Sequence, residues 1–118
     1  MKKISSMLLI LTVILFSCSK KETSADITIK ENNSAKSSIS VHMFSDNKGP
    51  NTAFFKPFHA DKTVATNSSG TAVFDLNEIV NDKQTTLYFG VFDANDNVLG
   101  STVITVKEGD SKSSTINY

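Results

Sequence analysis

With 118 residues the chain has room for one domain, and 101 residues follow position 17. Its twelve cationic residues are all lysines, and because Lys2 and Lys3 precede position 18, the remainder carries a net charge of −2. This balance argues against nucleic acid as a partner, and the absence of arginine and tryptophan removes the side chains that most often anchor protein interfaces.

The N-terminal segment has the layout of a secretory signal. Lys2 and Lys3 are followed by the apolar run Met7 to Phe16. Ten residues are too few to cross a bilayer, which takes about 20, but they match the apolar region of a signal peptide. We therefore expect residues 1–17 to be a signal peptide that is removed.

The run Leu15-Phe16-Ser17-Cys18 resembles the lipobox of bacterial lipoproteins of the Bacteroidetes type. The resemblance implies acyl chains such as palmitate on Cys18, which is also the only cysteine, and hence a membrane anchor. Ser19 stands where an aspartate would imply inner-membrane retention, so an outer-membrane location is expected, on its periplasmic or its surface face. The alternative is a plain secretory signal with an incidental cysteine.

Residues 18–25 are expected to form the lipidated terminus and a flexible polar tether, and residues 26–118 the folded domain. In that domain short apolar runs alternate with polar residues between clusters of Asn, Asp, Gly and Ser, which is typical of half-buried strands. Seven strands are predicted, around residues 27–29, 39–43, 64–66, 72–76, 85–92, 98–106 and 115–118.

Three details sharpen this pattern. Asn67 to Gly70 is predicted to be a hairpin turn, with Gly70 at positive φ. Thr85 to Phe92 is apolar on both faces in its second half, so a central strand covered on both sides is expected. Gly100 suggests a bulge or a close backbone approach within its strand.

These strands predict an all-β fold, a seven-stranded Greek-key sandwich of the prealbumin or immunoglobulin-like type. The segment Thr66 to Phe74 resembles the T-x-x-x-G-x-A-x-F run of transthyretin-like and carboxypeptidase-regulatory-like domains, and the hairpin from Val91 to Gly100 is also similar to theirs. The resemblance implies a structural or interaction module and seldom an enzyme.

No catalytic motif accompanies the two histidines, His42 and His59, so neither an enzyme nor a cofactor is expected. His42 should lie on the outward face of its strand. Asp93 to Asn97 carries oxygen side chains at alternate positions, as a calcium loop does, but Val98 and Ile104 stand where such a loop requires Gly and an acid. A hairpin turn explains the same residues, and no metal is expected.

The long connection Ser45 to Lys62 is the strongest candidate for a contact site. Phe54, Phe55, Phe58 and His59 could form an apolar contact patch on this loop. Alternatively, these aromatic residues fold back to cap the sandwich, or residues 53–55 form a further strand.

The expected function is that of a non-enzymatic lipoprotein of the cell envelope, whose domain contacts another envelope component through a sheet edge or the aromatic loop. The alternative is a module for glycans or other small ligands. This alternative is less favoured because a saccharide site needs exposed tryptophan or tyrosine rings, whereas tryptophan is absent and both tyrosines, Tyr88 and Tyr118, fall in predicted strands.

Overall fold

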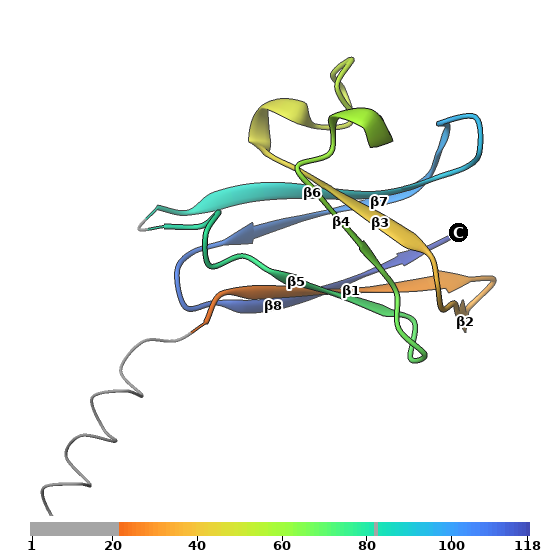
Figure 1. The fold of residues 1–118 in the computed structure, drawn as a ribbon, viewed down its shortest axis with the longest axis horizontal. Helices are drawn as coiled ribbons and strands as arrows, with labels where there is room; N and C mark the ends of the chain where they lie inside the picture. Colours follow the sequence, from red (N-terminus) through yellow and green to blue (C-terminus); the bar gives the residue numbers. More distant parts are fainter. Residues whose placement is uncertain (1–21, 82) are drawn as a thin grey trace, which may run out of the picture.

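The computed structural model describes residues 22–81 and 83–118 (Figure 1). The signal peptide predicted at 1–17 and the predicted lipid site Cys18 lie outside the described residues. Two single-turn 3₁₀ helices and eight strands form in this part of the chain: β1 (Ser24–Glu31), β2 (Ser34–Ala35), β3 (Ser40–Phe44), η1 (Asp46–Lys48), η2 (Pro57–His59), β4 (Lys62–Ala65), β5 (Thr71–Asp75), β6 (Thr85–Phe92), β7 (Val98–Val106) and β8 (Ser111–Asn117).

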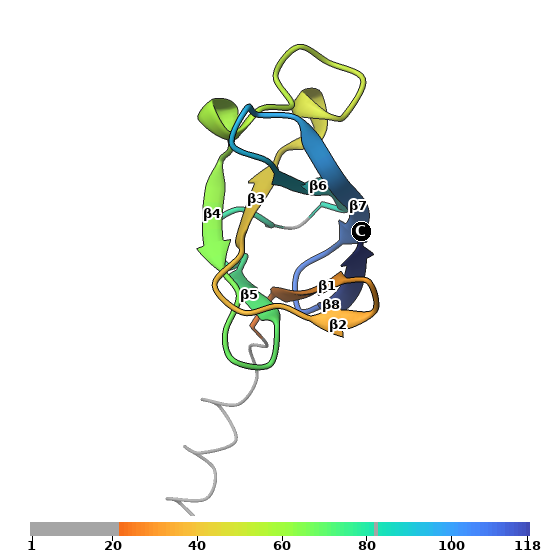
Figure 2. The same ribbon diagram turned by 90° about the vertical axis from the view of Figure 1, so that its right-hand side faces the viewer.

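The strands form two sheets that pack face to face as a sandwich. In the first sheet β8 runs parallel along one edge of β1, while β2 and β5 pair with the other edge. The second sheet is antiparallel, with the order β4-β3-β6-β7. Figure 2 shows β4 and β5 meeting at one side of the sandwich and β7 and β8 at the other. The predicted all-β sandwich is confirmed.

The alternating pattern builds the core. Ala25, Ile27 and Ile29 of β1 are fully buried, whereas the residues between them are only half-buried. Phe74 of β5 and Phe89 of β6 meet edge to face between the sheets, with ring centroids 5.0 Å apart. As predicted, β6 is a central strand, paired on both sides.

Two predicted local features are confirmed. Gly70 ends the turn after Asn67 with φ of +79°, a conformation that a side chain disfavours. Leu99 has no partner between the pairs Val91/Gly100 and Phe92/Val98, which places a bulge beside Gly100. At Gly100 a Cβ atom would lie 2.5 Å from Cγ2 of Ile116, so the opposite sheet also approaches the backbone closely.

The strand count is eight where seven were predicted. The additional strand, β2, has only two exposed residues and pairs with the end of β1, so it has no apolar alternation to reveal it. β8 begins at Ser111, four residues before the predicted start, because its polar first half is an edge that pairs with β1 through backbone groups. Thr66, predicted within a strand, lies just beyond β4.

The folded domain also starts earlier than predicted. Ser24 and Ala25, assigned to the flexible tether, already belong to β1, and Thr23 is 1% exposed. Thr23 is hydrogen-bonded to Asn77 in the β5–β6 connection and to Gly109 in the β7–β8 turn, and these bonds fix the start of the domain. No helix in the described ranges is both long and apolar enough to span a membrane.

Candidate functional site

The connection between β3 and β4, residues 45–61, is here called the outer loop. It folds over the outward face of the second sheet (Figure 1). Its Phe55 is 5% exposed, and the Phe55 ring lies 4.6 Å from that of Phe44 and 5.3 Å from that of Phe92. These three rings, which we call the aromatic layer, form a second apolar cluster on the side of the sheet away from the main core.

Gly90 makes room for the aromatic layer. A Cβ atom at Gly90 would lie 2.8 Å from Cζ of Phe55 and 3.0 Å from Cε1 of Phe92. The absence of a side chain therefore lets the Phe55 ring rest on the backbone of β6. A glycine inside a strand is a known signal of such a close approach, so Gly90 is the residue from which this contact could have been predicted.

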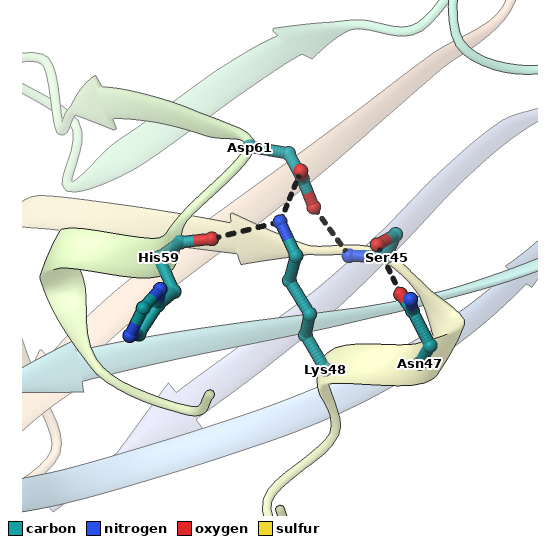
Figure 3. Close-up of polar contacts among 5 residues, drawn as sticks. All are labelled: Ser45, Asn47, Lys48, His59 and Asp61. Atoms are coloured by element: carbon teal, nitrogen blue, oxygen red, sulfur yellow. Dashed lines mark hydrogen bonds and ion pairs between the residues drawn. The ribbon is translucent and has the colours of Figure 1, made fainter. Parts of the chain in front are cut away.

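A polar network closes the two ends of the outer loop onto each other (Figure 3). The Lys48 ammonium donates to Oδ1 of Asp61 at 2.8 Å and to the His59 carbonyl at 3.1 Å. The other carboxylate oxygen of Asp61 accepts the Ser45 N–H at 2.7 Å. These contacts hold η1, η2 and the start of β4 together.

The same network sets the ionisation of Asp61. Partial burial favours the neutral carboxyl group, but hydrogen bonds from Lys48 and Ser45, together with the charge of Lys48, outweigh it and hold the pKa of Asp61 below its ordinary value. Sequence reasoning missed Lys48 and Asp61, since a pair of opposite charges thirteen positions apart in a loop carries no pattern.

The outer loop presents the remaining aromatic side chains to solvent. Phe58 is 89% exposed and Phe54 49% exposed, and the His59 ring lies between them with centroids 5.2 Å and 5.4 Å away. We call Phe54, Phe58 and His59 the aromatic patch. The structure thus divides the predicted set: Phe55 caps the sheet, the other three residues share a surface, and residues 53–55 form no strand.

His42 lies on the outward face of β3, as predicted, but it is half-buried. Its Nδ1 is 2.9 Å from the hydroxyl of Thr63, and its ring packs edge to face on Phe92 at 5.5 Å. Burial lowers the pKa of His42, against a smaller opposing effect of the Asp96 charge. His42 therefore extends the aromatic layer as a packed ring.

The turn from Asp93 to Asn97 uses its oxygen atoms internally. Oδ1 of Asp93 accepts the N–H groups of Asn95 and Asn97 at 2.8 and 2.9 Å, and Asp96 adopts φ of +65°. The N–H of Asn97 is the main contact that lowers the pKa of Asp93. In residues 22–81 and 83–118 no three His, Cys, Asp or Glu side chains are grouped to hold a metal.

No known family model and no curated protein matches the chain. The resemblances seen at Leu15–Cys18 and at Thr66–Phe74 stay predictions. Within the second segment the structure gives three residues clear roles: Thr66 is buried and its hydroxyl bonds to the Lys36 carbonyl at 2.7 Å, while Ala72 and Phe74 enter the core.

Proposed function

We propose that the protein is a lipoprotein anchored to the outer membrane through Cys18, and that its sandwich is a non-enzymatic module that binds another protein of the cell envelope. The aromatic patch is the contact surface. The anchor rests on the lipobox-like sequence, and the contact surface rests on the geometry of the outer loop.

The exposure of Phe58 carries the proposal. An apolar ring exposed to water lowers solubility unless a binding partner covers it, and clusters of exposed rings typically mark interaction sites. Here the cluster stands on a loop that the Lys48–Asp61 pair and the buried Phe55 ring hold in place. A fixed loop loses little conformational freedom when it binds, which favours recognition.

The environment of the histidines supports a non-enzymatic role. His42 packs against Phe92 and bonds to Thr63, and His59 lies between two phenylalanine rings. In the described residues neither imidazole is bonded to a carboxylate, and the Thr63 hydroxyl that bonds to His42 has no third group to complete a catalytic arrangement.

The contact surface is tested by photo-cross-linking in living cells. Benzoylphenylalanine replaces Phe58, and in a matched control it replaces Val73, an exposed apolar residue of β5 in the other sheet. We expect one cross-linked protein product from position 58, none from position 73, and loss of the product when Phe54→Ser is added. Equal products from both positions, no product, or a product indifferent to Phe54→Ser contradicts the proposal.

The anchor is tested separately. Labelled palmitate should enter the wild-type protein and not the Cys18→Ala variant, and equal labelling contradicts lipidation at Cys18. Protease added to intact cells then distinguishes the two faces of the outer membrane: cleavage of an epitope-tagged domain indicates the surface, and protection until the envelope is opened indicates the periplasm.

A further inference from the structure

The position at which the chain enters the domain, Thr23, shows which end of the sandwich can lie near an anchor. We infer that the end formed by Thr23, the β5–β6 connection and the β7–β8 turn faces the membrane. This inference rests on the proposed lipid anchor at Cys18. It assigns the bilayer itself as the partner of this end and places Ile79 nearest the lipid.

Thr23 is tied to both connections at this end. Its N–H donates to Oδ1 of Asn77 at 2.8 Å, and its carbonyl accepts the Leu76 N–H at 2.9 Å. Its hydroxyl accepts the Gly109 N–H at 2.8 Å, and the Ser24 N–H reaches the Asp110 carbonyl at 3.0 Å. Because Thr23 is also buried, the chain leaves the domain at a fixed point.

The length of chain before Thr23 limits how the domain can stand. Only four residues separate Cys18 from Thr23. Even fully extended, the two Cα atoms can be no more than about 18 Å apart. The eight residues of β6 span about 25 Å from one end of the sandwich to the other. An inverted orientation would lift Thr23 beyond the reach of the anchor, so it is excluded.

The same end carries an exposed apolar side chain among charged ones. Ile79 is 37% exposed in the β5–β6 connection, where its N–H bonds to the Leu76 carbonyl and the neighbouring Val80 is buried. Ile79 lines two hollows, one with Lys62, Asp75 and Glu78 and the other with Asn81, Lys83 and Thr85. The Lys62 ammonium donates to the Asp75 carbonyl at 2.8 Å, whereas Lys83 is exposed. The long stem of Lys83 can lie along an interface with its ammonium group in water, which suits contact with lipid headgroups.

This orientation also explains the position of the aromatic patch. The outer loop lies on the flank of the sandwich, between its two ends (Figure 1). If the Thr23 end faces the membrane, the aromatic patch points parallel to the membrane surface, where a neighbouring envelope protein can contact it.

The test measures the distance of three positions from the bilayer. A lipidated Cys18 has no free thiol and the chain has no other cysteine, so Ile79→Cys, Phe58→Cys and Asn95→Cys each introduce a unique labelling site. Each variant is purified from the membrane fraction, labelled with a fluorophore and reconstituted into phosphatidylcholine vesicles. Vesicles with and without nitroxide-headgroup lipid then report quenching of the fluorophore.

We expect quenching to be strongest at position 79, intermediate at 58 and weakest at 95. Insertion of twenty Gly and Ser residues between Lys21 and Glu22 should reduce the quenching at 79 at least two-fold, with the circular dichroism spectrum unchanged. Strongest quenching at 58 would mean that the sandwich lies on its flank with the patch in lipid, and strongest quenching at 95 would mean that it stands on the other end. Either result overturns the inference.

The mass of the purified protein separates this inference from the proposed anchor. A mass without acyl chains on Cys18 contradicts the anchor, whatever the quenching pattern. A lipidated protein with equal quenching at 79 and 95 leaves the anchor intact and contradicts only the orientation.

Discussion

The two faces of the β4-β3-β6-β7 sheet both carry apolar clusters, but the clusters are built in different ways. The inner face meets the other sheet in a core built by residues of β1, β3, β5, β6, β7 and β8. The outer face is covered only in part, by one loop whose buried aromatic residue is Phe55. The core therefore depends on many elements together, whereas the outer loop adds only one ring, that of Phe55, to the aromatic layer, and one ion pair holds the two ends of that loop together.

This difference assigns separate tasks to the two faces. Loss of a core residue leaves a cavity that two sheets cannot close without losing their strand pairing. Loss of a residue in the outer loop lets the loop move while the sandwich remains. Local stability differs in this way across many folds, and segments of lower stability commonly carry binding residues. Four substitutions test the division, from the largest expected effect to the smallest.

The largest loss is expected for Phe89→Ala in the core. Phe89 is fully buried and packs against Phe74 across the sandwich. Removal of the ring should lower the free energy of unfolding by about 3 to 5 kcal/mol, as lost burial and an unfilled cavity add together. Urea unfolding should show a lower midpoint at an unchanged slope. A loss below about 1 kcal/mol would mean that the core closes around the missing ring, and would contradict the difference proposed between the two faces.

A smaller loss is expected for Phe55→Ala in the aromatic layer. The outer loop can move into the space that the ring leaves, so no cavity remains. The free energy of unfolding should therefore fall only by the lost burial, about 2 kcal/mol. Hydrogen exchange should accelerate at the amides of Ser45 and Asp61, whereas the amides of β1 keep their protection. Equal acceleration in β1 would show that the aromatic layer and the core unfold as one unit.

Asp61→Asn should have a modest, pH-dependent effect. Because the pKa of Asp61 is lower in the folded chain than in the unfolded chain, the ionised carboxylate stabilises folding. That contribution is complete above the unfolded value of about 4 and is lost as the pH falls through the folded value. A partly exposed pair such as this one contributes less than about 1 kcal/mol.

The measurement is the difference in unfolding free energy between the wild type and Asp61→Asn from pH 7 to pH 2. The variant should be the less stable at pH 7, and the difference should disappear at low pH. Any contribution of Asp93, whose pKa is also lowered, cancels in this comparison. A difference that does not change with pH would exclude the carboxylate charge as its source.

Phe58→Ser should leave stability nearly unchanged. The ring is almost fully exposed, so its removal should change the free energy of unfolding by less than about 0.5 kcal/mol. Partner capture should still be lost, detected by cross-linking with benzoylphenylalanine placed at Phe54. A clear loss of stability would mean that Phe58 serves the fold, and the aromatic patch would then lack its most exposed residue.

Much of the fold was readable because strand alternation is a local property. Thr85–Phe92 and Val98–Val106 were predicted with the observed bounds, and the double-sided apolar character of the first indicated its central place. The start of β1 was missed because Ser24 and Ala25 look like tether. Their order comes from pairing with β5 and β8, which lie far along the chain.

The candidate site was readable only in outline. Its residues lie in a loop, where no periodicity tells an inward ring from an outward one. The fate of each phenylalanine depends on how the loop meets the sheet beneath it. Gly90 leaves space for the Phe55 ring, and the Lys48–Asp61 pair ties together the two ends of the loop that carries it.

The sequence by itself determined the all-β class, the main strands and the turn at Gly70, because alternation and backbone preference act between near neighbours. Only the tertiary structure decided that Phe55 is buried while Phe58 is exposed, and that Thr23 belongs to the domain. Both outcomes depend on contacts between segments that are distant in sequence, and such contacts leave no local pattern to read.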